Sequence, residues 1–297
     1  MSRWPAALLV AAAALLLAAC GAPADQGPRD WPAPSPALWS VAAPDGGEGW
    51  LLGTIHALPE GLEWRNPALE RALAQSAVLV VELAELGDTR AAAAAFARRA
   101  RSPGLPPLLA RLPPDQRPAL AAALEAAGLA ERDFAETESW AAALTLANAL
   151  RRHDPAHGVD RALIAEARAA GRPVIGLETL DGQFALFDAL PPPAQARLLA
   201  AVPAEADPAA QDARVAAWLA GDLATLEREA EAGLLADPAL REWLQLARNR
   251  AWAARIAALV ERGERPFVAV GAAHLLGEEG LPALLAARGF AVRRVGG

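Results

Sequence analysis

Near its C-terminus the chain contains Val268-Ala269-Val270-Gly271-Ala272-Ala273-His274-Leu275-Leu276-Gly277-Glu278-Glu279-Gly280. An apolar run without charge, followed by glycine, is typical of a buried strand that ends in a turn. The same order occurs in Trp50-Leu51-Leu52-Gly53-Thr54-Ile55-His56-Ala57-Leu58-Pro59-Glu60-Gly61. Each copy has a strand, then Gly-x-x-His, then an apolar pair, and shortly afterwards an acidic residue and glycine. We therefore expect His56 and His274 just past the carboxyl ends of two strands and on no helix face, where open α/β sheets bind ligands.

Other apolar runs of the same kind extend this pattern along the chain. Short uncharged runs that predict strands occupy residues 50–52, 78–81, 173–177, 267–270 and 290–292. Prolines and glycines bound predicted helices at residues 66–75, from Pro113-Pro114 to Gly128, and at residues 238–262. Residues 90–172 and 181–264 read as almost wholly helical. We predict an α/β fold, with a central, mostly buried sheet and two long helical insertions that form a cap within one domain, residues 38–297.

Two carboxylates stand at the ends of predicted strands, as the two histidines do. Glu82 follows the apolar run of residues 78–81, and Glu178 follows residues 174–177. A carboxylate at the end of a buried strand requires a metal, an arginine or a substrate as its partner. Two imidazoles and two carboxylates at strand ends are also the ingredients of a divalent-metal hydrolase site.

Structural interpretations of these four residues stay open. A histidine at the end of a strand is frequently a core or turn residue that is bonded to the backbone. Glu82 and Glu178 are each open to a structural ion pair with an arginine such as Arg248 or Arg250.

The remaining candidates for a catalytic group are few. His153 and His157 are four residues apart, but Pro155 lies between them and Gly158 follows, so we expect a loop and not a metal-binding helix face. The chain has no Gly-x-Ser-x-Gly sequence.

Composition excludes several classes of protein. The chain has 297 residues, of which 54% are hydrophobic, so it is long enough for a sizeable core and is no hormone, disulfide scaffold or disordered tail. Its net charge is -7, and no stripe of basic residues with interleaved aromatics occurs, so we expect no nucleic acid as a partner.

The N-terminal residues predict a signal for export. Arg3 precedes an apolar stretch, residues 8–19, which is shorter than the roughly 20 residues of a spanning helix. The stretch ends in Leu17-Ala18-Ala19-Cys20-Gly21, which resembles a bacterial lipoprotein signal cut before an acylated cysteine. We expect residues 1–19 to be removed, Cys20 to carry the lipid and residues 20–37 to form a flexible tether. The alternative is an ordinary cleaved signal peptide in which Cys20 is incidental.

Ala22, rather than Asp, follows Gly21. By the same resemblance, this predicts a location in the cell envelope, on the outer membrane and facing the periplasm.

Taken together, these residues resemble the TraB/GumN family, whose animal relatives are the Tiki metalloproteases. The matches cover the chain from about Trp39 to Val295 and comprise residues 51–59, Glu82, Gly158-Val159-Asp160, residues 176–179 with Gln183, Arg248-Asn249, residues 270–275, Gly280-Leu281 and Leu284-Leu285. One departure is Ala272-Ala273, where relatives often have glycine before the histidine.

The resemblance implies that both Gly-x-x-His motifs face one site, and for the Tiki relatives it implies a metal-dependent peptidase. His56 and His274 then take the histidine roles, Glu82 and Glu178 the acidic ones, while Arg248 lines the site as charge partner and Asn249 as orienting amide.

The leading hypothesis is a lipid-anchored, metal-dependent hydrolase that acts on peptides or proteins. His56, His274 and one of Glu82 and Glu178 hold Zn, Mn, Co or Fe, the other carboxylate is the general base, and Arg248 stabilises the oxyanion. A second hypothesis is a metal-free esterase-type site with His56 as base, oriented by Glu82. A third is a lipoprotein that binds a peptide or protein without turnover.

Overall fold

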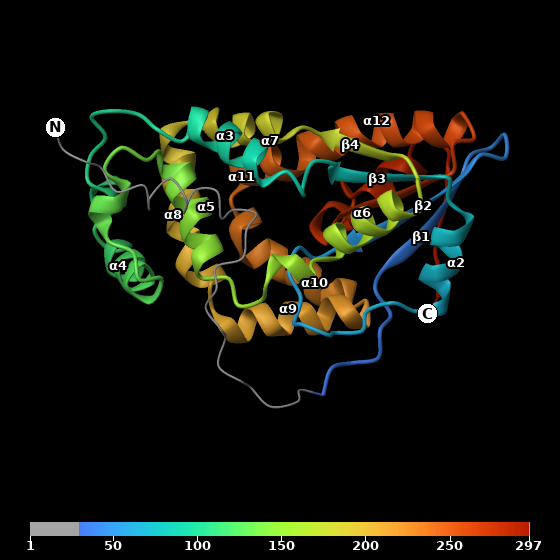
Figure 1. Cartoon of the computed structure of the whole chain (residues 1–297), viewed down its shortest axis with the longest axis horizontal. Helices are drawn as coiled ribbons and strands as arrows, with labels where there is room; N and C mark the ends of the chain where they lie inside the picture. Colours follow the sequence, from blue (N-terminus) through green and yellow to red (C-terminus); the bar gives the residue numbers. More distant parts are fainter. Residues whose placement is uncertain (1–29, 297) are drawn as a thin grey trace. The chain divides into compact units, whose positions relative to one another are not determined.

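Six strands form one mixed sheet in the computed structural model, which describes residues 30–296 (Figure 1). The strands are β1 (Leu38–Ala42), β2 (Glu48–Thr54), β3 (Val78–Leu83), β4 (Val174–Glu178), β5 (Pro266–Gly271) and β6 (Ala291–Arg294). Their order in the sheet is β4-β3-β5-β2-β1-β6. The first four in this order are parallel neighbours, and β1 is antiparallel to β2 and β6. The predicted α/β class is confirmed.

All five predicted strands are present, and β1 is an addition. In β1, Leu38-Trp39-Ser40-Val41-Ala42, a polar residue interrupts the apolar run, so the continuous hydrophobicity that marked the other strands is missing. The strand forms by pairing with β2 through a tight turn, in which Gly46 has a φ of 96°. Antiparallel pairing of this kind needs only a short connection.

The chain divides into two compact units. The sheet unit contains residues 30–84, 153–179 and 212–296 of the described chain, and the helical unit contains residues 85–152 and 180–211. The helices of the helical unit are α3 (Thr89–Arg99), α4 (Arg117–Ala126), α5 (Ser139–Ala149), α7 (Leu180–Asp188) and α8 (Pro192–Glu205). The remaining helices are α2 (Pro67–Gln75), α6 (Val159–Ala169), α9 (Pro208–Ala220), α10 (Leu223–Ala232), α11 (Pro238–Arg241), α12 (Ala247–Glu261) and α13 (Leu281–Ala286).

The predicted helices are present, but the one expected to begin at Pro113-Pro114 begins at Arg117 and ends at Ala126. Asn66 caps α2 through its side-chain oxygen, which accepts a hydrogen bond from Leu69 N at 2.9 Å. The predicted helix at residues 238–262 is present, but it contains a π-helical segment, Glu242–Leu246, between α11 and α12. Gly263, with a φ of 70°, follows its end.

An aromatic cluster forms the core of the helical unit. Phe96 of α3 meets both Trp140 of α5 and Phe184 of α7 edge to face, with ring centroids 5.4 Å apart in each pair. Arg99 of α3 bonds Asp181 and Asp188 of α7 at the surface of this unit.

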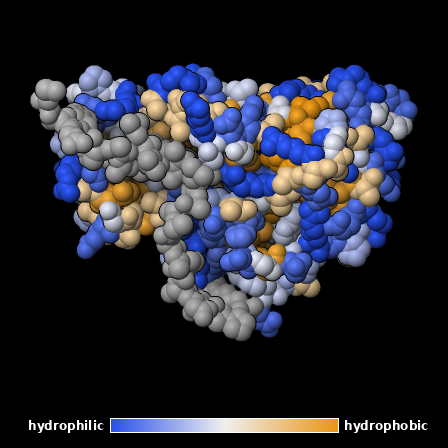
Figure 2. Space-filling view, viewed as in Figure 1, coloured by the Kyte–Doolittle hydropathy of each residue, from blue (hydrophilic) through white to orange (hydrophobic). Residues whose placement is uncertain are grey.

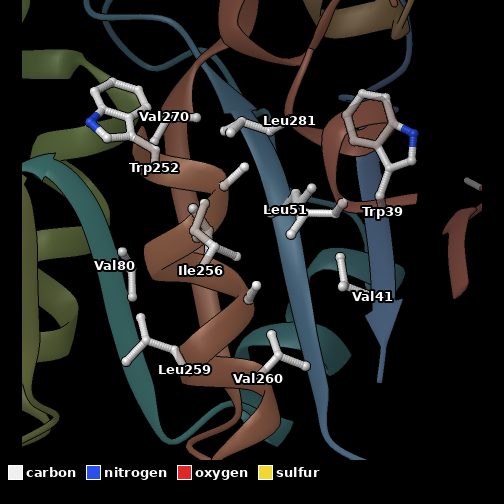
Figure 3. Close-up of a cluster of buried hydrophobic side chains, with 14 of the residues drawn as sticks. Trp39, Val41, Leu51, Val80, Trp252, Ile256, Leu259, Val260, Val270 and Leu281 are labelled. Carbon is white, nitrogen blue, oxygen red and sulfur yellow. The ribbon is translucent and has the colours of Figure 1, made fainter. Parts of the chain in front are cut away.

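In the sheet unit, α12 covers one face of the sheet (Figure 3). Ile256 and Val260 of α12 pack with Leu51, Val80 and Val268, and all five side chains are fully buried. The intervening residues of each strand point to the opposite face, and α6 packs against β3 and β4. Both faces are therefore covered, as the uninterrupted apolar strands predict.

The first described residues join the sheet unit as well. Ser35 N donates to Leu219 O at 2.7 Å, and Ala37 is buried, so the last part of the predicted tether packs against the fold. The predicted signal peptide, Cys20 and the rest of the tether up to residue 29 lie outside the described residues. Figure 2 shows hydrophilic residues over much of the viewed face, and among residues 30–296 no helix combines the length and apolarity needed to cross a bilayer.

Replacing Val260 by alanine tests the core. Val260 is fully buried whereas Val292, on the edge strand β6, is partly exposed. We expect Val260→Ala to lower the free energy of unfolding by about 2 kcal/mol and Val292→Ala to lower it by much less, because the first change leaves a cavity. Urea unfolding measures both variants, and equal losses would contradict this packing.

Candidate functional site

The four strands that run parallel bring the predicted site residues to one edge of the sheet. Glu82 is the last residue but one of β3, Glu178 ends β4, and His56 follows the end of β2 by two residues. His274 follows β5, in a single 3-10 turn, Ala272–Leu275. The expectation that neither histidine lies in a helix is therefore wrong for His274, since Ala272-Ala273 allows the chain to wind at once after Gly271.

Arg248 of α12 occupies the centre of this group. Its Nε and Nη2 donate to the two oxygens of Glu178 at 2.7 and 2.9 Å, and Nη2 also donates to Glu82 Oε2 at 2.8 Å. Its Nη1 donates to Leu244 O at 2.8 Å and lies 3.3 Å from His274 Nε2. These five contacts match the five N–H groups of a guanidinium. Arg248 is thus a fully bonded cation between two carboxylates.

Glu82 is ionised although it is buried. Burial opposes its charge, but the charges of His274 and Arg248 and the Gly271 N–H, 2.8 Å from Oε1, lower the pKa of Glu82 to about 2. The charge of His56 lowers the pKa of Glu82 as well.

His274 has one defined tautomer. Asn249 Nδ2 donates to Glu279 O at 2.8 Å, which turns the amide oxygen of Asn249 toward His274 Nδ1 at 2.6 Å. Nδ1 therefore carries the proton, and Nε2 accepts from Arg248. Burial lowers the pKa of His274 to about 4, against the attraction of Glu82, so the imidazole is neutral at pH 7.

His56 has a different environment from His274. Its Nδ1 lies 2.9 Å from Asp160 Oδ2, and Thr54 Oγ1 donates to the other oxygen of Asp160 at 2.8 Å. The His56 side chain is 62% exposed whereas that of Asp160 is 4% exposed. An ionised carboxylate only accepts, so Nδ1 is the donor, and in the neutral ring of His56 the lone pair is then on Nε2.

Sequence reasoning gave Asp160 no role and assigned the orientation of His56 to Glu82 instead. Asp160 stands in the first turn of α6, not at the end of a strand, so the strand-end pattern did not include it. The sequence signal was Gly158-Val159-Asp160, where Val159 N donates to Ile55 O at 3.1 Å. A Cβ on Gly158 would lie 2.2 Å from His56 O, so only glycine permits this close approach.

Gly271 brings the two halves of the site together. A Cβ on this residue would lie 3.1 Å from Glu82 Oε1 and 3.6 Å from His56 Nε2. The glycine of the second Gly-x-x-His motif therefore lies next to both the Glu82 carboxylate and the His56 imidazole.

The other candidates lie elsewhere. His153 Nε2 contacts Asp212 Oδ1 at 2.8 Å, and His157 ends a 3-10 turn, Pro155–His157, so the pair shares no helix face, as expected. Arg250 bonds Glu242 and lies 3.7 Å from Glu279, so Arg248 alone of the two arginines pairs with Glu82 and Glu178.

The donor atoms do not fit a bound divalent metal in this arrangement. Both oxygens of Glu178 and Oε2 of Glu82 accept from Arg248, which also faces His274 Nε2. Three of the four oxygens of the two glutamates, together with Nε2 of His274, therefore already face a cation of the protein, and the fourth oxygen, Glu82 Oε1, accepts from the Gly271 N–H. Within residues 30–296, no three His, Cys, Asp or Glu side chains are arranged as a metal site.

Fold and site together define an α/β protein with a polar site at the carboxyl edge of parallel strands. The sequence profile of the TraB/PrgY/gumN family matches residues 37–294, which is most of the chain, and the chain belongs to this family. The expected family is thereby confirmed. Comparisons with curated proteins and with solved structures found no match.

The depressed pKa of His274 predicts a loss of stability in mild acid. The imidazole has a pKa of about 4 in the folded chain and 6.5 as its ordinary value. Its contribution is complete above pH 6.5 and is lost as the pH falls toward 4, because the unfolded chain then binds the proton first. Between pH 7 and pH 5 we expect a loss of about 2 kcal/mol.

Urea unfolding at both pH values measures this loss. His274→Asn should show a pH dependence smaller by that amount, since asparagine does not titrate. An identical pH dependence in the variant would contradict the buried, neutral state of His274.

Proposed function

We propose that this protein is a hydrolase of the cell envelope that cleaves peptide bonds, with His56 as general base. The observation that carries the proposal is the contact of 2.9 Å between His56 Nδ1 and the buried Asp160, beside an imidazole that is 62% exposed. A general base needs one ring nitrogen oriented by a carboxylate and an imidazole that a substrate can reach.

In the proposed reaction, His56 Nε2 takes a proton from a water molecule as the water oxygen attacks the substrate carbonyl carbon. The carbon–nitrogen bond then breaks, and the imidazolium returns its proton to the leaving nitrogen. Asp160 holds the Nδ1–H tautomer and stabilises the imidazolium. Thr54 bonds the second oxygen of Asp160 and so limits its rotation.

Glu82 and Arg248 have supporting roles in this proposal. The charge of His56 interacts with the Glu82 carboxylate, which therefore favours the protonated imidazole that forms during the reaction. Arg248 has its five N–H groups engaged, so we assign it the positioning of Glu82, Glu178 and His274 and not the stabilisation of an oxyanion.

Membrane attachment and substrate class are parts of the same proposal. The sequence up to Cys20 supports a lipid anchor, which would hold the domain at the outer membrane on the periplasmic side. The resemblance to the Tiki proteases supports peptides or proteins as substrates.

Removal of either partner of the His56–Asp160 pair tests the proposal. We expect His56→Ala to lower kcat for peptide cleavage by about 10² to 10⁴-fold, and Asp160→Asn to lower it substantially, because the base is lost or misoriented. His157→Ala is the matched control, a histidine in a 3-10 turn outside the site. Mass spectrometry of a peptide library incubated with the full chain in detergent measures the cleavage.

Full activity of His56→Ala would contradict the proposed base. Retention of peptides without any cleavage would favour the binding-protein hypothesis instead.

The family resemblance implies that activity requires a divalent metal, and chelation tests this separately. Because Arg248 takes the carboxylate oxygens, we expect cleavage to survive exhaustive chelation. Elemental analysis of the metal-replete protein provides the independent measurement. One equivalent of metal in the wild type, lost in both His56→Ala and His274→Ala, would contradict this and support the metal-dependent hydrolase.

A further inference from the structure

We infer that Gln245 is a positioning residue of this site, whose side-chain amide fixes the turn that carries His274. Gln245 is almost completely buried, at 5% exposure, and buried amides require partners. Gln245 Nε2 donates to the backbone oxygen of Ala273, the residue before His274. The proposed base does not use Gln245, and no sequence pattern singled it out.

The turn depends on this bond because its own hydrogen bond is long. Leu276 N donates to Ala273 O at 3.4 Å, which is near the limit for such a bond. Gln245 therefore supplies the closer donor to this carbonyl. Gln245 and Ala273 are 28 residues apart in the sequence, so this bond connects the turn to the helix that carries Gln245.

The surrounding helix adds two further contacts with the same turn. Arg248 Nη1 lies 3.3 Å from His274 Nε2, and Asn249 Oδ1 accepts from His274 Nδ1 at 2.6 Å. Arg248 and Asn249 follow Gln245 by three and four residues, the spacings that bring side chains to one side of a helix. The turn is thus held at a backbone oxygen and at both nitrogens of the imidazole.

The local helix geometry supports a specialised role for this segment. Gln245 lies in the π-helical segment Glu242–Leu246, where Ala247 N donates to Glu242 O, five residues back. Such wide turns are rare and frequently occur at functional sites. Movement of the turn would also displace Gly271, whose N–H bonds Glu82.

The inference deepens the proposed function but does not depend on turnover for its test. The whole chain has four histidines, so ¹⁵N-histidine NMR of the full chain in detergent gives few signals. His274→Asn identifies the His274 signal by its loss. In the wild type we expect a single Nδ1–H tautomer with a slowly exchanging proton.

Gln245→Met keeps the length of the side chain and removes the donor. We expect it to remain folded by circular dichroism, while the His274 Nδ1 proton exchanges about tenfold faster or the two tautomers mix. The matched control is Gln195→Met in the helical unit. Gln195 is similarly buried and donates to Leu190 O at 3.1 Å, so its loss should destabilise the chain without changing the His274 signals.

Unchanged exchange and tautomer of His274 in folded Gln245→Met would overturn the inference, whether or not any peptide is cleaved. Should that variant fail to fold, the wild type supplies the test. Slow exchange of the Gln245 side-chain amide protons supports the bond to Ala273, and exchange at the rate of a free amide overturns it. Altered His274 signals without any peptide cleavage would support this inference and reject the proposed hydrolase.

Discussion

The site depends on the burial of one guanidinium between two carboxylates. Arg248 crosses from α12 to the ends of β3 and β4 and reaches the turn after β5, so one side chain joins four elements. Desolvation makes such a group unfavourable unless every donor is bonded, and a carboxylate left without its partner would be worse. The positions of Glu82, Glu178 and His274 are therefore mutually constrained.

The histidines of the two Gly-x-x-His motifs differ in role because their hydrogen-bond partners differ. His274 is buried, its Nδ1 meets the neutral amide of Asn249, and burial keeps the pKa of its imidazole at about 4. His56 is exposed, and its Nδ1 meets the carboxylate of Asp160. A neutral acceptor and a candidate base thus arise from the same local sequence. Repetition in the chain predicts a shared location, and the second contact of each ring decides the chemistry.

The sequence was informative where a property is local. Uninterrupted apolar runs predicted five strands, and a charged residue at the end of such a run identified Glu82 and Glu178. Asp160 was missed because its contact with His56 joins residues 104 positions apart and follows from the packing of α6. The π-helical segment that holds Gln245 was missed as well, since its apolar spacing resembles that of an ordinary helix. Partners chosen by tertiary packing leave little trace in one sequence.

The net negative charge of this site would favour a bound metal cation, but the oxygen and nitrogen atoms that would bind it already have hydrogen-bond partners. Asp160, Glu82 and Glu178 carry three negative charges against the one positive charge of Arg248. A metal beside His274 would have to displace Arg248 from its carboxylates or lie close to a like charge. A protonated His56 does not have to displace Arg248, because it already bonds Asp160 and interacts with the charge of Glu82. The surplus of negative charge therefore favours the imidazolium, which is the form that a general base takes at the transition state.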